Sequence, residues 1–131
     1  MIAVDTNVVV TLLVREDDPA HGRVKDLFVQ SFIYIAPTVL LEAEWVIRSR
    51  YKWLQPHVLR ALADLLAMPN VQTEIWVGKA IAWASSGLDL ADALHFAGSE
   101  SAESFYTFDR DLIRKGRALD GGLSFFEAPD L

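Results

Sequence analysis

The chain has 131 residues and a formal net charge of −6, from 18 Asp and Glu against 12 Lys and Arg. Such a surface repels a phosphate backbone, which excludes a generally basic nucleic-acid coat unless cations or local basic patches intervene. The hydrophobic content of 52% predicts one packed domain over residues 1–131. Because the sequence has no cysteine, disulfides, thiolate nucleophiles and cysteine-ligated metals are excluded, and catalysis would have to use oxygen or imidazole groups.

Neither the amino terminus nor the interior of the sequence predicts export or membrane insertion. Residues 1–14 are apolar but have no basic leader, and Asp5 and Asn7 interrupt them. The longest uncharged run, residues 27–41, is too short to span a bilayer and contains Pro37. We therefore expect a soluble, cytoplasmic protein with no membrane contact.

The apolar residues in the first half of the chain predict strands that alternate with helices. Short β-branched or aromatic runs indicate strands, and apolar residues three and four positions apart indicate amphipathic helices. In chain order, we expect a strand at 2–4, a helix at 8–14, a helix from Asp17-Asp18-Pro19 to about 30, a strand at 32–36, helices at 38–52 and 55–68, and a brief strand at 71–73. The polar trio Asp5-Thr6-Asn7 then lies at the turn from the first strand to the first helix.

The second half of the sequence continues this alternation. We expect helices at 76–86 and 90–99 separated by Gly87, a strand at 105–108, a charged helix at 109–119, a turn at 120–122 and an edge strand at 123–126. Asp89 is the expected N-cap of the helix at 90–99. Strands that alternate with helices predict an α/β fold, a three-layer sandwich with a central, mainly parallel sheet flanked by helices.

Four carboxylates lie where such a sheet holds its functional crevice, outside the carboxyl ends of the strands. Asp5 and Asp109 each follow a strand directly, Asp92 lies in the opening turn of a helix, and Glu42 lies in the helix after the second strand. Clustered carboxylates repel one another unless a multivalent cation screens them. All-oxygen ligation suits Mg²⁺ or Mn²⁺ better than zinc. We therefore predict that these four acids are metal ligands.

Some of these acids also have a purely structural interpretation. Asp5 could simply cap the following helix, but an unpaired carboxylate at the crowded end of an apolar strand is costly, and Thr6 and Asn7 suffice as caps. Asp89 and Asp92 stand three residues apart, as in a capping box, and this explains both residues as well as metal binding does. We assign the cap to Asp89 and the metal to Asp92.

Two further acids compete for places in the site. Glu44 has Arg48 four residues later, the preferred orientation for a surface ion pair, whereas Glu42 has no cation on its own helix. Glu42 is therefore the better candidate ligand. Asp111 could open the following helix, and we place it outside the metal shell or behind it. The three histidines form no ligand pattern, and His95 is expected to be packed or hydrogen-bonded.

A carboxylate-held cation without a Ser or Cys nucleophile predicts hydrolysis of a phosphodiester by an activated water. Cations border the predicted acids on two helices. They are Arg48, Arg50 and Lys52 at the end of the helix that carries Glu42, and Arg110, Arg114, Lys115 and Arg117 beside Asp109. We take the second group as candidate RNA-binding residues. Charged helix ends are often only solvated, which explains the first group at least as well.

The acids lie within segments that resemble a known family. The order and spacing of four segments resemble the motifs of the PIN-domain nucleases: Val4-Asp5-Thr6-Asn7-Val8, Thr38-Val39-Leu40-Leu41-Glu42, Leu90-Ala91-Asp92-Ala93-Leu94 and Thr107-Phe108-Asp109-Arg110-Asp111. The length and the motif order resemble in particular the VapC toxins of toxin–antitoxin pairs. The resemblance covers nearly the whole chain.

This resemblance implies a Mg²⁺- or Mn²⁺-dependent endoribonuclease, the toxin of a type II pair, that is inhibited by a cognate VapB-like antitoxin and forms a homodimer. The residues that match the family are the metal-binding Asp5, Glu42, Asp92 and Asp109 and the supporting polar Asn7 and Thr107. The four tryptophans, Trp45, Trp53, Trp76 and Trp83, could supply apolar contact surface for a dimer or belong to the core. An acidic pocket suits a basic residue on the inserted tail of an antitoxin.

Two other functions remain open at this stage. Asp5 could be the nucleophile of a dehalogenase-like phosphatase, but that class has a second acid two residues later, and this chain has Asn7 there. The chain could also be a non-catalytic Mg²⁺-binding module, either receiver-like or PIN-like, that binds other proteins. Incubation with RNA, with and without EDTA, distinguishes the nuclease from both.

Overall fold

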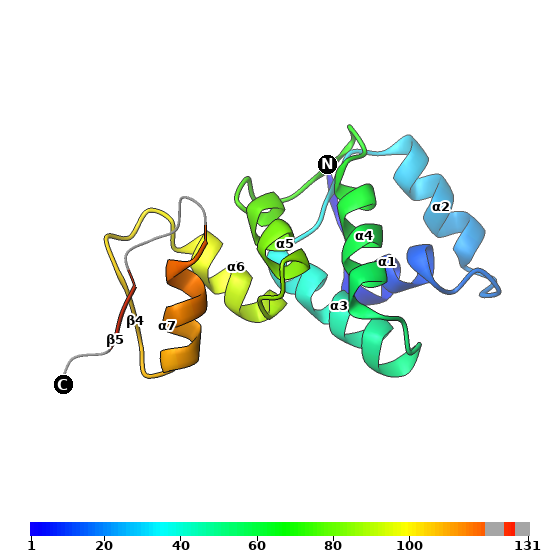
Figure 1. Cartoon of the computed structure of the whole chain (residues 1–131). Coiled ribbons are helices and arrows are strands. Elements are labelled where there is room, and N and C mark those ends of the chain that lie inside the picture. The colour runs from blue at the N-terminus through cyan, green and yellow to red at the C-terminus, as the bar shows by residue number, and fades with distance from the viewer. Residues whose placement is uncertain (120–124, 128–131) are drawn as a thin grey trace. The chain divides into compact units, whose positions relative to one another are not determined.

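The structure, a computed structural model, describes residues 1–119 and the backbone of residues 125–127. These residues form two compact units, Met1–Ile75 and Trp76–Leu131. Figure 1 shows the elements of each unit in chain order. No helix in the described part of the chain is long and apolar enough to cross a membrane.

The first unit is a three-stranded parallel sheet with four helices (Figure 1). The strands are β1 (Ile2–Ala3), β2 (Ile33–Tyr34) and β3 (Val71–Gln72), with β2 in the middle. Ile33 is in register with Ile2 on one side and Val71 on the other. Because parallel neighbours need long crossover connections, two helices fill each connection. They are α1 (Thr6–Leu13) and α2 (His21–Gln30), then α3 (Pro37–Arg50) and α4 (Gln55–Leu66).

Apolar side chains of the helices and of β2 form the core of this unit. Helix α1 contacts α2 and α3, and α3 contacts α4. The fully buried residues include Val9, Val10, Phe28, Ile33, Ile35, Leu40, Ile47, Val58 and Leu62. Asn70 connects β3 to the end of α2, since its Nδ2 donates to the carbonyl oxygens of Phe28 and Ser31 at 2.5 and 2.8 Å.

The second unit consists of three helices and a two-stranded parallel sheet. Its elements are α5 (Val77–Ser85), α6 (Leu90–Gly98), β4 (Phe105–Thr107), α7 (Arg110–Arg117) and β5 (Phe125–Glu127). Helix α5 packs on α6, and α7 contacts both strands. The rings of Phe96 and Phe105 meet edge to face, with centroids 4.8 Å apart, which joins α6 to β4.

The predicted fold class is confirmed, since every described strand pair is parallel and helices connect the strands. The sequence predicted one central sheet, whereas the described strands form two, and they are shorter than expected. The helix expected from Asp17 begins at His21, because Asp18 Oδ1 accepts from Ala20 N and its carbonyl accepts from His21 N in a preceding turn. The turn predicted at 120–122 lies outside the described residues.

Candidate functional site

Asp5 lies between β1 and α1, and it is the N-cap of that helix. Its Oδ1 accepts a hydrogen bond from the backbone N–H of Thr6 at 2.6 Å. The side chain is exposed. Two details of the sequence interpretation are therefore wrong: the cap is Asp5 itself rather than Thr6 and Asn7, and the carboxylate is not crowded. The cap uses one of two carboxylate oxygens, so capping and metal binding are compatible.

The residues that follow Asp5 begin α1. Asn7 is exposed in the first turn of the helix, where its amide is accessible. Thr6 is 7% exposed, and its Oγ1 is buried without a hydrogen-bond partner among the described residues. An orphaned hydroxyl oxygen of this kind costs stability. The turn after β1 thus holds one exposed carboxylate, one exposed amide and one unsatisfied hydroxyl.

The two acids of α3 have opposite environments. Glu42 is exposed, whereas the side chain of Glu44 is only 4% exposed and binds Arg48 Nε through Oε1 at 2.8 Å. The predicted pairing of Glu44 with Arg48 is confirmed, but its description as a surface pair is wrong. Ala43 and Ile47 are four residues apart and therefore lie on the same face of α3, which is buried. Glu44, next to Ala43, is buried with them. Glu42 is therefore the accessible acid of this helix.

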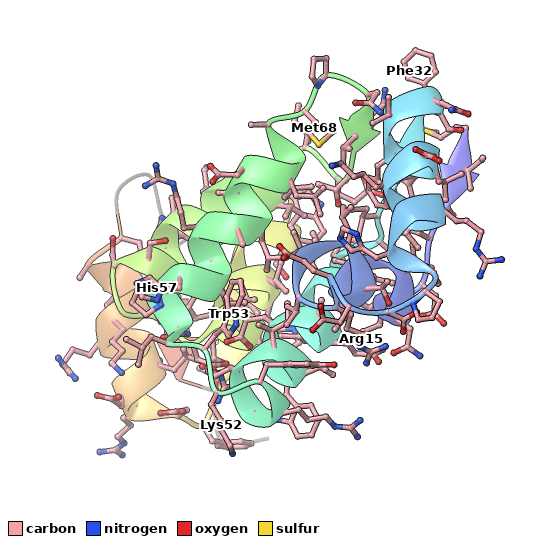
Figure 2. The ribbon with its side chains drawn as sticks, turned by 90° about the vertical axis from the view of Figure 1, so that its right-hand side faces the viewer. Arg15, Phe32, Lys52, Trp53, His57 and Met68 are labelled. Atoms are coloured by element: carbon pink, nitrogen blue, oxygen red, sulfur yellow. The ribbon has the colours of Figure 1, made fainter. Side chains whose placement is uncertain are left out.

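The basic end of α3 is mainly solvated. Arg48 is engaged by the buried Glu44, and Arg50 and Lys52 are exposed. Figure 2 shows Lys52 at the turn between α3 and α4, where its φ is 60°. These cations have a local structural explanation, which favours the solvated interpretation that the sequence left open.

In the second unit, Asp89 is the N-cap of α6 and accepts a hydrogen bond from the backbone N–H of Asp92 at 3.3 Å. The predicted cap is thus confirmed. Asp92 lies in the first turn of the helix and is half-buried. The division of roles between the two acids follows from this geometry, because the capping oxygen belongs to Asp89 while the Asp92 carboxylate is left for other partners.

Asp92 lies among charged groups that change its ionisation. Partial burial raises the pKa of Asp92, and the negative charges of Asp89 and Asp109 raise this pKa further, while His95 and Lys115 oppose the rise. His95 is exposed, so the expectation that it is packed is wrong. Of the two carboxylates that raise this pKa, Asp89 has the larger effect and Asp109 the smaller. A divalent cation bound nearby would offset such repulsion.

Asp109 lies directly after β4 and caps α7. Its Oδ1 accepts from the backbone N–H of Leu112, and its own N–H donates to Thr107 Oγ1, each at 3.1 Å. The hydroxyl of Thr107 thus fixes the backbone that carries the Asp109 carboxylate. Thr107 was selected from the sequence as a supporting residue, and this contact is a physical means of support.

The candidate RNA-binding cations on α7 include two that pair with an acid of the same helix. Arg114 and Lys115 both bind Asp111, with 3.2 Å between Lys115 Nζ and Asp111 Oδ2. The hydrogen bonds from Arg114 and Lys115 lower the pKa of Asp111. Arg110 and Arg117 are exposed on the same helix. Asp111 is therefore committed to the cations of its own helix.

The acids fit a hard cation by their chemistry, since they supply only oxygen donors. The first unit contains Asp5 and Glu42, and the second contains Asp92 and Asp109. In the described part of the chain, no group of three or more His, Asp or Glu side chains is placed to hold a metal ion. The carboxylate oxygens of each unit fit Mg²⁺ or Mn²⁺ by their chemistry. Each unit supplies two of the four predicted ligands.

Sequence reasoning missed a hollow of about 340 Å³ in the second unit, between the turn that joins α5 to α6 and helix α7. Gly87, with a φ of 114°, forms part of that turn. The sequence signal for the turn was this single glycine between two helices. This turn and α7 line the same hollow through a tertiary arrangement, which local sequence patterns do not predict.

Acids at the N-terminal ends of α1, α6 and α7, in an α/β protein with parallel strands, supply oxygen donors of the kind that divalent cations prefer. The family model of the PIN domain matches residues 2–118, which span both units. The chain therefore belongs to the PIN-domain family, as its motifs predicted. A search of curated proteins gives no match. PIN domains are generally metal-dependent nucleases.

Proposed function

We propose that this protein is a Mg²⁺- or Mn²⁺-dependent endoribonuclease in which Asp5, Glu42, Asp92 and Asp109 supply the metal ligands. The observation that carries the proposal is the PIN-domain family match, whose residues 2–118 include all four acids. When bound, the divalent cation supplies Lewis-acid chemistry, which activates water and neutralises the charge that develops on a phosphodiester. The family match over residues 2–118 also supports a single PIN-like domain over 1–131.

The chain's own residues orient the ligands and the substrate. Thr107 fixes the backbone at Asp109 through its hydroxyl, and Asn7 offers an amide two residues after the cap residue Asp5. The cations of α7 attract phosphates toward an otherwise acidic protein. They are Arg110, Arg114, Lys115 and Arg117. We propose RNA as the substrate, because the sequence resembles ribonuclease toxins.

We further propose that the nuclease is the toxin of a toxin–antitoxin pair in the cytoplasm, with a VapB-like antitoxin as its partner and a homodimer as its assembly. Exposed apolar side chains in the first unit support protein contacts there. Trp45 is 53% exposed on α3, and Leu54 is 66% exposed in the turn after it. Induced expression should arrest growth, and expression of Asp92→Asn should not.

The test is cleavage of a labelled single-stranded RNA by the purified chain with Mg²⁺, compared with the same reaction in EDTA. We expect cleavage with Mg²⁺ only, and a loss of about 100-fold or more in Asp92→Asn. Glu100→Gln, which changes an exposed acid of the same unit, is the matched control and should retain activity. Mg²⁺ binding without cleavage would favour the non-catalytic module instead.

A further inference from the structure

The hollow in the second unit is not lined by any of the acids assigned to the metal. Its described walls come from the end of α5, the turn that follows and the later part of α7. The lining residues are Trp83, Ser86, Gly87, Leu88, Arg114, Lys115, Ala118 and Leu119. A volume of about 340 Å³ is at the lower end of the range for small-molecule sites, which suits a single nucleotide.

Backbone geometry keeps one side of this hollow open. Gly87 has a φ of 114°, a conformation that side chains other than glycine rarely adopt. Among the described residues, no heavy atom beyond Gly87 and its two chain neighbours lies within 4 Å of the position that a Cβ at residue 87 would occupy. The chain therefore turns from α5 to α6 beside Trp83 without filling the space next to it.

The charge of the hollow is opposite to that of the protein. Its described lining includes two cations and no carboxylate, although the chain has a net charge of −6. The side chains of Arg114 and Lys115 are 72% and 46% exposed. A third cation is close, since Lys79 Nζ lies 5.6 Å from the centroid of the Trp83 ring. An aromatic face with three cations around it matches a nucleobase joined to a phosphate.

Arg114 and Lys115 lie on α7, the helix that Asp109 caps, so one helix carries both an acid of the proposed site and the charged wall of the hollow. We propose that the hollow binds one nucleotide of a single-stranded RNA, with the base stacked on Trp83 and a phosphate on Arg114 and Lys115. This inference rests on the proposed function, since it names the site that holds the substrate strand next to the acids. Asp111 now binds both cations, so the phosphate has to compete with the Asp111 carboxylate.

The test measures binding of a fluorescein-labelled single-stranded RNA decamer of mixed sequence to the full chain in EDTA, where metal-dependent cleavage does not occur. We expect Trp83→Ala to weaken binding about tenfold, and Trp83→Phe to retain most of the affinity because a ring can still stack. The matched control is Phe32→Ala, at an exposed aromatic residue of the first unit, which should bind like the wild type. Circular dichroism verifies that each variant is folded, and the salt slopes of Arg114→Gln and Lys115→Gln keep the test decisive if Trp83→Ala does not fold.

The charged wall has its own readout. Arg114→Gln and Lys115→Gln should each lower the salt slope of RNA binding by about 1, as expected for the loss of one phosphate contact. Asp111→Asn should tighten binding, because it removes the competing carboxylate. Wild-type salt slopes in Arg114→Gln and Lys115→Gln, together with unchanged binding in any folded Trp83→Ala, would overturn the inference. If the Trp83 and cation variants lose binding but the wild type cleaves no RNA, the nuclease function fails while the hollow remains an RNA site.

Discussion

Asp5 in the first unit and Asp109 in the second occupy the same local position, directly after a strand and as the N-cap of the next helix. Their constraints differ. Asp109 accepts from Leu112, three residues later, and its backbone is held by Thr107, whereas among the described residues Asp5 accepts a side-chain hydrogen bond only from its neighbour Thr6. The same sequence pattern thus yields one firmly oriented carboxylate and one loosely oriented carboxylate. The Asp109 carboxylate is therefore oriented both by its bond to Leu112 and by the Thr107 contact at its backbone, and the Asp5 carboxylate by its bond to Thr6.

The largest expected effect is on activity, and it should be alike at the two positions. Asp5→Asn and Asp109→Asn each remove a charged ligand but keep a side chain that can cap a helix, so we expect RNA cleavage to fall about 100-fold or more in each. The rate of single-turnover cleavage measures this loss. Asp64→Asn, an exposed acid on α4, is the control. Full activity in Asp5→Asn would limit the catalytic acids to the second unit.

The next effect is on stability and concerns the ion pair between the buried Glu44 and Arg48 in the first unit. Arg48→Met leaves the Glu44 carboxylate buried without this partner, which should lower the free energy of unfolding by about 3 kcal/mol. Urea denaturation measures the change. Arg60→Met is the matched control, because the Arg60–Asp64 pair has the same spacing but both side chains are more than 70% exposed, and it should change stability by about 0.5 kcal/mol or less. Equal effects of the two substitutions would show that burial of Glu44 is unimportant.

Removal of the two caps compares the same positions by stability. Asp109→Ala loses the bond to Leu112 N–H and should cost about 1 kcal/mol, and Asp5→Ala should cost less because its bond to the adjacent N–H is a poorer cap. Thermal unfolding of both variants gives the order. A larger loss in Asp5→Ala would contradict the contrast drawn between the two carboxylates.

The smallest effects are on the pH dependence of stability, where Asp92 and Asp111 should act with opposite signs. The pKa of Asp92 is raised by burial and by nearby carboxylates, so its ionisation lowers stability as the pH rises from about 3.9 through the raised value. The pKa of Asp111 is lowered by Arg114 and Lys115, so its contribution is complete above about 3.9 and is lost as the pH falls through the lowered value.

Melting temperatures measured across this pH range check both signs. We expect Asp92→Asn to raise the Tm near neutral pH, and Asp111→Asn to flatten the loss of stability at the acid end. The second effect is small, because water and salt screen an exposed pair. A lower Tm for Asp92→Asn at neutral pH would mean that its carboxylate stabilises the folded chain.

Local features of the molecule could be predicted from the sequence, and non-local ones could not. The cap at Asp89, the pairing of Glu44 with Arg48 and the separation of α5 from α6 at Gly87 depend on residues within one or two helical turns. The order of strands and helices depends on periodicity, which is local as well. These features therefore matched the structure closely.

The exposure of Asp5, the burial of Glu44 and the hollow beside Trp83 depend on packing between segments far apart in the chain. Alternation of apolar residues predicts strands but not how many sheets they form, so the division into β1–β2–β3 and β4–β5 was missed. The site acids were found because they follow strands and match motifs in order. That the four acids bind a metal together remains a proposal, which binding and activity measurements have to test.

Mn²⁺ binding, followed by the loss of the free-ion signal in electron paramagnetic resonance, tests most directly whether acids of both units bind the metal. The wild type is compared with Asp5→Asn from the first unit and Asp92→Asn from the second. If the four acids act together, each substitution weakens Mn²⁺ binding by about tenfold or more. Wild-type Mn²⁺ affinity in Asp5→Asn, with binding lost in Asp92→Asn, would contradict the proposal.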